Sequence, residues 1–185
     1  TQVFLQIFSD IEVILVVSRT CPFRHEELTD CFEGRRQVRV VTGGATRFES
    51  VKNGLAAIGD EGLVFIHDAV RPFISKNFLM QLQEEAMLYG NAIPCIEVQD
   101  SLRKVQGAEN VTVRRDEYRA IQTPQVFDAK HIKQAYEQPF GEAFTDDASV
   151  LEAAGYKINL VGGLRENIKI TTPADLKYAE WMVAG

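Results

Sequence analysis

Short runs of consecutive apolar residues recur along the chain and predict the strands of an α/β fold. Val13–Val17 and Leu63–Ile66 are continuous apolar runs made of Val, Ile, Leu and Phe. Such runs are typical of strands that are buried on both faces of a parallel sheet. Residues 38–41 predict a further strand. Residues 92–98 predict another, which Pro94 makes irregular or places near the edge of the sheet.

Amphipathic segments lie between these runs and predict the helices. Residues 47–58 place Val51, Leu55 and Ile58 on one face at helical spacing. Helices are also predicted at residues 1–8, 25–32, 77–89 and 128–137, from Thr145 to a stop at Gly155, and after Thr172. Thr145 and Thr172 are suitable N-caps, because a hydroxyl oxygen can accept a backbone N–H bond from the first turn. The order strand, helix, strand, helix, strand is the doubly wound pattern.

Residues 100–119 differ in character from the rest of the chain. They combine a turn near Gly107 and an alternating stretch at 111–113 with a set of basic side chains, namely Arg103, Lys104, Arg114, Arg115 and Arg119. This pattern predicts a two-stranded arm, and because a lone hairpin is only marginally stable in water, we expect a second subunit to cover it. After the arm, strands are predicted at residues 122–127, with a kink, and at 158–161 and 167–170.

Composition narrows the class of protein. A chain of 185 residues with 45% hydrophobic and 25% charged residues is typical of one globular domain, and no repeat or linker divides residues 1–185. The net charge of −6 argues against a general nucleic-acid binder. No apolar run approaches the roughly 18 residues that span a membrane, and no signal peptide is visible. We therefore expect a cytoplasmic protein with neither nucleic-acid nor membrane partners.

The cysteines and histidines do not have the spacing of a disulfide framework or a zinc site. Cys21, Cys31 and Cys95 are odd in number and unpaired in spacing, which predicts reduced thiols. The three histidines lie far apart in the sequence, and no Cys/His cluster is present.

The segment that follows Leu63–Ile66 carries the first candidate chemistry. In an open α/β sheet, ligands bind beyond the carboxyl ends of the strands, and Asp68 stands at such an end. Its carboxylate could meet a metal ion or a ribose hydroxyl. Ala69 lets backbone approach a ligand closely, and Arg71 offers a forked set of donors suited to phosphate. A polar turn after a strand explains the same residues equally well.

Three further candidates have simple structural explanations of their own. The pattern Gly43-Gly44-x-x-Arg47-x-x-Ser50 joins a strand to a helix N-terminus, where anions or carbonyl oxygens can bind, but a tight turn also explains its glycines. Lys169 interrupts an apolar strand, and alternation alone would place it on the solvent face. The arm arginines fit a solvated surface or ion pairs between subunits, and Thr145 is accounted for as a helix cap.

Taken together, these motifs resemble one known family. They are GGATRFESVKNGL at residues 43–55, HDAVRPF at 67–73, Asp100-Ser101, QTPQVF at 122–127, TDDAS at 145–149 and NIKIT at 167–171. Their order and spacing are similar to those of the 2-C-methyl-D-erythritol 4-phosphate cytidylyltransferase family, and the resemblance covers nearly all 185 residues. It implies a Rossmann-like three-layer α/β/α nucleotidyltransferase fold with a protruding β-arm at about residues 99–122, and a homodimer joined through that arm.

The resemblance also implies an activity and a set of site residues. The reaction is transfer of CMP from CTP to the alcohol phosphate 2-C-methyl-D-erythritol 4-phosphate, with Mg²⁺ and release of pyrophosphate, in non-mevalonate isoprenoid biosynthesis. By position, the nucleotide would be held by Gly44, Ala45, Ser50, Asp68 and Ala69. The alcohol phosphate would be held by Arg71, Ser101, Arg115, Thr145 and Lys169. Arg115 and Lys169 would act in catalysis, Arg115 across the dimer arm, and Asp68 would be the metal ligand.

The sequence departs from the family pattern in three places. Ala45 replaces a position that often carries an acidic or polar side chain, so a base contact there must come from backbone. Ser101 replaces a common Thr and keeps the hydroxyl. The strand and glycine-rich loop, with its Arg and Lys, that open the family are not seen. We expect the sequence to omit an N-terminal segment, since a sheet without that central strand would leave buried backbone groups unpaired at roughly 1–3 kcal/mol each.

Two alternative functions remain open at the level of sequence. One is a cytidylyltransferase of the same superfamily that acts on ribitol 5-phosphate, against which the arm argues. The other is a nucleotide-binding protein without turnover, which only the missing loop favours. For transfer to 2-C-methyl-D-erythritol 4-phosphate, the barrier is electrostatic. The attacking phosphate is already ionised, so the reaction needs cations rather than a strong general base.

Overall fold

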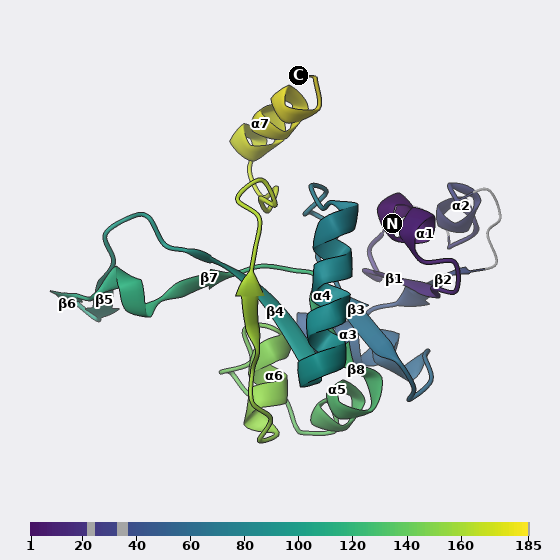
Figure 1. The fold of residues 1–185 in the computed structure, drawn as a ribbon, viewed down its shortest axis with the longest axis horizontal. Coiled ribbons are helices and arrows are strands. Elements are labelled where there is room, and N and C mark those ends of the chain that lie inside the picture. The colour runs from purple at the N-terminus through teal and green to yellow at the C-terminus, as the bar shows by residue number, and fades with distance from the viewer. Residues whose placement is uncertain (22–24, 33–36, 185) are drawn as a thin grey trace. The chain divides into compact units, whose positions relative to one another are not determined.

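We describe the protein from a computed structural model, drawn in Figure 1, for residues 1–21, 25–32 and 37–184. Its contacts divide the chain into two units. The first unit comprises Thr1–Ile66 and Phe127–Ile158, and the second comprises His67–Val126 and Asn159–Gly185. Each unit is described here by itself.

The first unit alternates helices with strands, as the apolar runs predict. Its elements are α1 (Gln2–Ile7), β1 (Val13–Val17), α2 (His25–Asp30), β2 (Val38–Thr42), α3 (Arg47–Ala56), β3 (Leu63–Ile66), α5 (Ala129–Ala135) and α6 (Asp147–Ala153). Strands β1 and β2 pair in parallel, with Val13 opposite Val38 and Val17 opposite Thr42. All four residues of β3 are half-buried, and β1 is half-buried except at Val16, which is exposed, so the expectation of strands buried on both faces is wrong for both runs.

Aromatic packing under α3 forms much of the core of the first unit. The Phe48 ring stacks on Tyr136 at 4.7 Å between centroids and on Phe144 at 5.7 Å. Ile132 of α5 and Leu151 of α6 are almost completely buried. Burial of such side chains is the main favourable term in folding, at about 1.5–3 kcal/mol for each large residue.

The second unit is built around one helix and one strand. Its elements are α4 (Lys76–Tyr89), β4 (Asn91–Glu97), β5 (Arg103–Gln106), β6 (Glu109–Thr112), the short 3₁₀ helix η1 (Arg115–Glu117), β7 (Arg119–Ile121), β9 (Leu160–Gly162) and α7 (Pro173–Ala184). β8 (Gln125–Asp128) runs across the boundary between the units. Leu79 and Leu82 of α4 are fully buried, and α4 packs against β4, where Ile93 is also fully buried.

Pro94 does not place β4 at an edge. The strand pairs antiparallel with β7, where Cys95 lies opposite Ile121, and in parallel with β9, where Pro94 lies opposite Val161. The Pro94 carbonyl accepts a bond of 2.8 Å from the backbone N–H of Gln122. Proline lacks only the donor, so its acceptor still joins a regular strand at this position.

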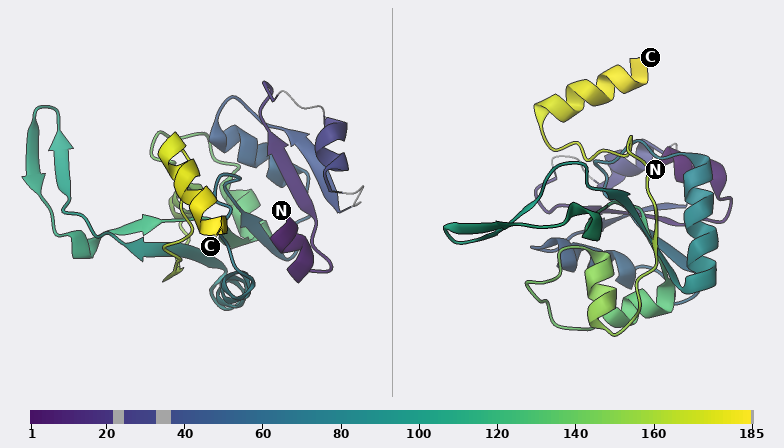
Figure 2. Two further views of the ribbon diagram at one scale, coloured as in Figure 1. Left: turned by 90° about the horizontal axis from the view of Figure 1, so that it is seen from above. Right: turned by 60° about the vertical axis from the view of Figure 1, so that its left-hand side comes forward.

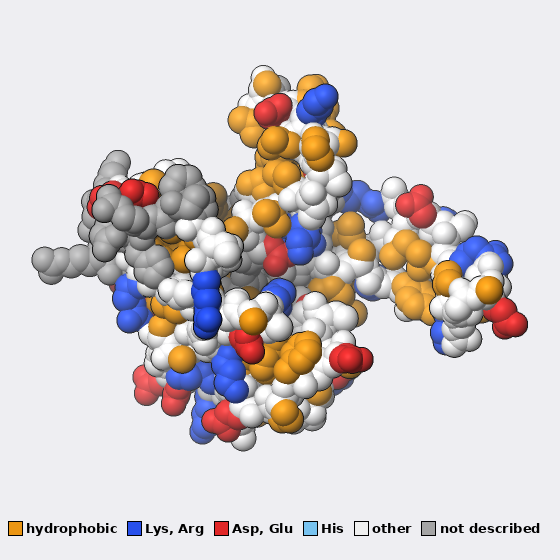
Figure 3. Space-filling view, turned by 180° about the vertical axis from the view of Figure 1, so that it is seen from behind, with side chains coloured by type: hydrophobic (Ala, Val, Ile, Leu, Met, Phe, Trp, Pro, Cys, Tyr) orange, Lys and Arg blue, Asp and Glu red, His pale blue; other side chains and the backbone are white. Residues whose placement is uncertain are grey.

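The predicted arm is confirmed. β5 and β6 pair antiparallel from Arg103 opposite Thr112 to Gln106 opposite Glu109, and Gly107 turns the chain with φ of +60°. All eight strand residues are exposed. Figure 2 shows the arm reaching outward beyond β7, and Figure 3 shows basic and apolar side chains side by side on it.

Residues 167–170 do not form the predicted strand. The segment has no regular secondary structure, and its Ile170 N–H donates to the Val70 carbonyl at 2.9 Å. Asn167 is completely buried, and its side-chain amide donates to the Thr123 carbonyl at 2.8 Å. Bonds from side chains therefore take the place of a strand ladder here. Within the described residues, no helix is long and apolar enough to cross a membrane.

Several elements begin or end one or more residues away from the predicted positions. Asp146, not Thr145, caps α6, because its carboxylate accepts the Ser149 N–H while the Ser149 hydroxyl accepts the Asp146 N–H. α3 ends at Ala56 rather than at residue 58. The predicted strand at 122–127 begins only at Gln125, after the cis Thr123–Pro124 bond. The predicted helix at 25–32 ends at Asp30, and the predicted strand at 158–161 becomes β9.

Candidate functional site

A carboxylate between two cations lies beyond the end of β3, in the second unit. The Asp68 Oδ2 atom is 3.1 Å from Lys169 Nζ and 3.4 Å from Arg71 Nε. The Asp68 and Arg71 side chains are 15% and 13% exposed, whereas that of Lys169 is 46% exposed. Strand alternation alone suggests that Lys169 points into solvent. In the structure its ammonium group instead contacts Asp68.

Arg71 also ties this loop to the segment that carries Lys169. Its Nη1 donates to the Asn167 carbonyl at 2.8 Å. One carboxylate cannot neutralise two cations, so the cluster keeps an excess of positive charge. An exposed ammonium beside a fixed guanidinium can bind a phosphate group by charge-assisted hydrogen bonds.

His67 holds the loop that carries Asp68 and Arg71 through both of its ring nitrogens. Its Nε2 is 3.0 Å from the Arg71 carbonyl oxygen, and its Nδ1 is 3.0 Å from Thr123 Oγ1. Burial lowers the pKa of His67 from 6.5 to about 4, although the bond to Arg71 opposes this shift. The imidazole is therefore neutral at physiological pH.

The Gly43-Gly44 loop of the first unit is closely packed against the start of α3. A Cβ at Gly43 would lie 2.7 Å from Ser50 Oγ, and one at Gly44 would overlap the Glu49 side chain. The Gly44 N–H donates to Ser50 Oγ at 3.1 Å, and the Ala45 N–H donates to Glu49 Oε2 at 2.6 Å. These glycines serve the close approach of the loop to α3. The Gly43 N–H donates to the Val17 carbonyl of β1 at 2.7 Å, and the Gly44 N–H is taken by Ser50 of α3.

An ion pair between the exposed Arg47 and the buried Asp147 joins the starts of α3 and α6 within the first unit. Arg47 Nη1 and Nη2 donate to the two carboxylate oxygens of Asp147 at 2.9 Å and 2.5 Å. The Tyr136 hydroxyl donates to Asp147 Oδ1 at 2.6 Å, and burial together with the Asp147 charge raises the Tyr136 pKa. Asp147 is completely buried and its oxygens are satisfied, so the pair anchors the exposed Thr145 next to it. Sequence reasoning includes Asp147 only as part of the TDDAS motif and misses this role.

Arg115 lies at the base of the arm in a basic pocket of the second unit. Its Nη1 donates to the Gln99 carbonyl. The pocket has a volume of about 370 Å³ and is lined by Glu97, Val98, Gln99, Arg115, Asp116, Arg119 and Arg165. Ser101 is exposed near this base. Of the arm arginines, Arg115 and Arg119 therefore share one concave surface, whereas Arg103 and Arg114 do not line it.

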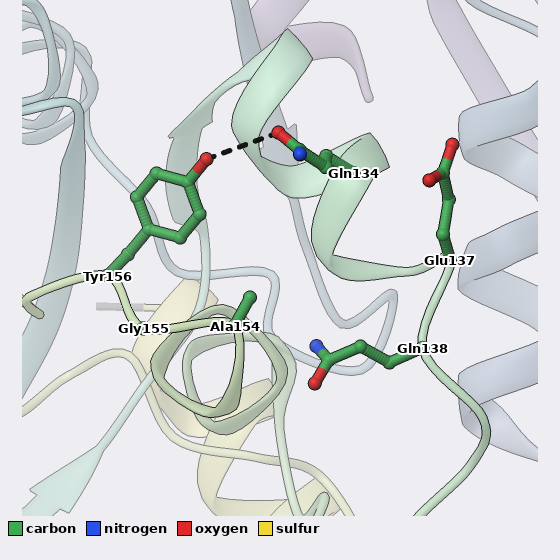
Figure 4. Close-up of a pocket in the computed structure, with 6 residues that line it drawn as sticks. All are labelled: Gln134, Glu137, Gln138, Ala154, Gly155 and Tyr156. Carbon is green, nitrogen blue, oxygen red and sulfur yellow. Dashed lines mark hydrogen bonds between the residues drawn. The ribbon is translucent and has the colours of Figure 1, made fainter.

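A second cavity, of about 520 Å³, lies in the first unit and contains none of the predicted site residues. It is lined by Gln134, Glu137, Gln138, Ala154, Gly155 and Tyr156 (Figure 4). The Tyr156 hydroxyl reaches Gln134 Oε1 at 3.4 Å. Its lining has no cation, which does not suit a phosphate ligand.

Comparison with known proteins decides the family. A family model described as 2-C-methyl-D-erythritol 4-phosphate cytidylyltransferase matches residues 2–184. The chain belongs to this family. The protein of that name from Phocaeicola vulgatus is 42% identical over 182 residues, which cover 98% of this chain and 83% of that protein. The one from Bacteroides fragilis is 47% identical over 171 residues, which cover 91% and 77%.

Solved structures of the cytidylyltransferase family have the same fold as this chain. The crystal structure of the Thermus thermophilus protein aligns with a TM-score of 0.79 and 29% identity, covering 100% of this chain and 88% of that one. The structure of 4-diphosphocytidyl-2C-methyl-D-erythritol synthase from Anaerococcus prevotii aligns with a TM-score of 0.84 and 29% identity, covering 100% and 85%. The predicted α/β nucleotidyltransferase fold and the family resemblance are confirmed.

The structure brings some of the residues expected from the cytidylyltransferase resemblance into contact. Asp68, Arg71 and Lys169 form one cluster, and Gly44 is bonded to Ser50. Ala45, Ala69, Ser101, Arg115 and Thr145 are exposed. Their roles toward a ligand stay predictions. His67, Thr123, Arg47 and Asp147 support these positions. Only the presence of these four residues inside the quoted motifs could have indicated them from sequence.

The single carboxylate of Asp68 suits a metal ion that is bound together with substrate phosphates. Among the residues that the structure describes, no group of three or more His, Cys, Asp or Glu side chains could hold a metal. Mg²⁺ is commonly bound by one or two carboxylates together with substrate phosphates and water. Asp68, as a single carboxylate beside two cations, fits that mode and not a cage made by the protein alone.

Proposed function

We propose that this chain transfers CMP from CTP to 2-C-methyl-D-erythritol 4-phosphate and releases pyrophosphate, as a step of non-mevalonate isoprenoid biosynthesis. The match of the family model to residues 2–184 carries this proposal. The contact of Asp68 with Arg71 and Lys169 supports it, since two cations converge where an anionic substrate needs them.

The reaction joins two anions, so its barrier is mainly electrostatic. A phosphate oxygen of the alcohol phosphate attacks the α-phosphorus of CTP. The new P–O bond forms as the bond from the α-phosphorus to the bridging oxygen breaks, and that oxygen leaves with pyrophosphate. The nucleophile is already ionised, so no side chain has to remove a proton. Positioning and charge neutralisation supply the rate enhancement.

The alcohol phosphate is held by Arg71 and Lys169, with Arg115 as a third cation. Arg71 is fixed by Asp68 and by the Asn167 carbonyl, so its guanidinium is preorganised. Lys169 is half-exposed and can turn its ammonium from Asp68 to an arriving phosphate. Ser101 and Thr145 each offer a hydroxyl to the substrate, and Arg115 and Lys169 neutralise charge in the transition state.

The nucleotide is held by the loop after β2 and by the loop after β3. Gly44, Ala45 and Ser50 contact the cytosine, and Asp68 and Ala69 contact the ribose and the α-phosphate. Asp68 would hold Mg²⁺ in part, and the bound ion would neutralise charge on the triphosphate.

We also propose that the protein works as a cytoplasmic homodimer joined through the arm. Val105 and Val111 of the arm are 68% and 58% exposed, and apolar side chains on a two-stranded ribbon favour a covering partner. The free thiols of Cys21, Cys31 and Cys95 fit a reducing compartment.

The test is pyrophosphate release by the full-length protein with CTP and Mg²⁺. 2-C-methyl-D-erythritol 4-phosphate and ribitol 5-phosphate are offered separately. We expect turnover with the first alone. Turnover with ribitol 5-phosphate alone would show that ribitol 5-phosphate is the substrate. No pyrophosphate release with either substrate, from protein whose mass is verified, would favour a nucleotide-binding protein without turnover.

A further inference from the structure

A chain of hydrogen bonds runs beneath the Asp68–Arg71 loop, entirely within the second unit. The Asp68 N–H donates to Thr123 Oγ1 at 3.0 Å. Thr123 Oγ1 lies 3.0 Å from His67 Nδ1, and His67 Nε2 lies 3.0 Å from the Arg71 carbonyl oxygen. This series of hydrogen bonds thus begins at the backbone of Asp68 and ends at the backbone of Arg71, which are both proposed site residues.

The chemistry of the acceptors fixes the direction of these bonds. A carbonyl oxygen can only accept, so His67 Nε2 carries the proton that it donates to Arg71. With one ring proton, Nδ1 is an acceptor, and the Thr123 hydroxyl donates to it. The same hydroxyl oxygen accepts the Asp68 N–H. Every bond in the chain then has one donor and one acceptor.

This chain holds both ends of the turn that presents the charged cluster. The Arg71 N–H donates to the Asp68 carbonyl at 3.0 Å and closes the turn. His67 fixes the Arg71 carbonyl, and through Thr123 it fixes the Asp68 N–H. The Thr123 backbone is itself held, because the buried Asn167 amide donates to its carbonyl at 2.8 Å. The backbones that carry the Asp68 carboxylate and the Arg71 guanidinium are therefore oriented through one imidazole.

We propose that His67 is a positioning residue for the transfer reaction: it orients Asp68 through Thr123 and Arg71 through its carbonyl, and it does not itself contact substrate. The proposal rests on the proposed function, because it takes Asp68 as a nucleotide contact and Arg71 as an alcohol-phosphate contact. Imidazole suits the task because it offers a donor and an acceptor on opposite sides of a rigid ring.

Two amide variants of His67 separate its bond to Arg71 from its bond to Thr123. In His67→Gln the side-chain nitrogen can take the place of Nε2 and keep the bond to Arg71, while the bond to Thr123 is lost. In His67→Asn the side-chain oxygen can take the place of Nδ1 and keep the bond to Thr123, while the bond to Arg71 is lost. The matched control is His131→Asn, because His131 lies on α5 in the first unit, outside the proposed site.

The experiment measures KM for CTP and for 2-C-methyl-D-erythritol 4-phosphate with the full-length protein. We expect His67→Gln to raise KM for CTP, and His67→Asn to raise KM for the alcohol phosphate, each by about tenfold with the other KM nearly unchanged, because a displacement below 1 Å is enough for such a loss. His131→Asn should match the wild type.

A readout that does not need activity accompanies the kinetics. The chain has three histidines, so long-range ¹H–¹⁵N NMR of the imidazoles can be assigned by single substitutions. We expect the His67 ring to carry its proton on Nε2 at neutral pH. A proton on Nδ1 would overturn the proposal.

The outcomes distinguish this proposal from the proposed function. A wild-type protein that is silent with both substrates overturns the proposed function and, with it, the role given to His67. An active wild type whose two amide variants raise both KM values equally, with a lower melting temperature, leaves His67 a structural residue only. Variants that match the wild type in both KM values also overturn the positioning role.

Discussion

At the scale of the residue, the Asp68 carboxylate holds two cations of different mobility. Arg71 is nearly buried and also bonded to the Asn167 carbonyl, whereas the Lys169 side chain is half-exposed. We predict that Lys169→Ala lowers kcat/KM for the alcohol phosphate by about 10²-fold, because a lost charge contact to a reacting phosphate is expensive in a preorganised site. CTP affinity should stay near the wild-type value. Steady-state kinetics and calorimetric titration with CTP measure the two effects.

The control for this prediction is Lys130→Ala, which removes an exposed lysine of α5 in the first unit. It should leave both quantities unchanged. An equal loss of CTP affinity and of alcohol-phosphate use in Lys169→Ala would contradict the role assigned to Lys169.

At the scale of the element, the start of α7 depends on one carboxylate. The Thr172 N–H donates to Asp175 Oδ2 at 2.8 Å, and the Thr171 N–H donates to the same atom at 3.0 Å. These bonds hold the Asp175 pKa below its usual 3.8. A lowered carboxyl pKa in the folded state means that the stabilisation is present above pH 3.8 and is lost as pH falls through the lowered value.

We therefore predict that Asp175→Asn lowers the melting temperature at pH 7, and that the difference from wild type shrinks as pH falls below 3.8. Thermal melts followed by circular dichroism at several pH values measure this. Glu180→Gln, which removes an exposed carboxylate later in α7, serves as the control and should show no such pH-dependent difference. A difference that persists in acid would argue against the cap as its source.

At the scale of the whole molecule, the proposed dimer makes a sharp prediction about Arg115. If the arm supplies Arg115 to the partner's site, Arg115→Ala and Lys169→Ala protein should complement each other when mixed. Random exchange then restores about a quarter of the wild-type activity, because half of the dimers are mixed and one of the two sites in each is intact. Denaturation and joint refolding, followed by the pyrophosphate assay, tests this. Activity no higher than the sum of the two variants would place Arg115 in its own subunit's site.

Several elements could be predicted from sequence because their causes are local. β1 and β3 follow from continuous apolar runs, and the start of α7 follows from Thr172 and Pro173 at its first positions. Gly90 ends α4 in the left-handed region, with φ of 79°, as a glycine after an amphipathic run predicts. Each of these signals acts within a few residues, so the sequence carries it directly.

The failures occur where a polar contact, to a distant or to a neighbouring residue, overrides the predicted pattern. Residues 167–170 have the alternation of a strand, yet the Asn167 amide bonds to Thr123 and Lys169 turns to Asp68. Thr145 is a good cap by type, but Asp146 completes a reciprocal box with Ser149 and takes its place. Local propensity is a weak preference of tenths of a kcal/mol to about 1 kcal/mol, and one buried hydrogen bond can outweigh it.

The sequence by itself determined most of the order of helices and strands, the exposed arm and the family, because periodicity, caps and motif spacing lie along the chain. Only the tertiary structure decided which charges meet. Arg47 reaches Asp147 across 100 residues, and His67 reaches Thr123 across 56. Such pairs form because the folded backbone brings the ends of separate elements together, and burial then requires each polar group to find a partner. The physical reason is that a contact between distant residues depends on the path of the whole chain.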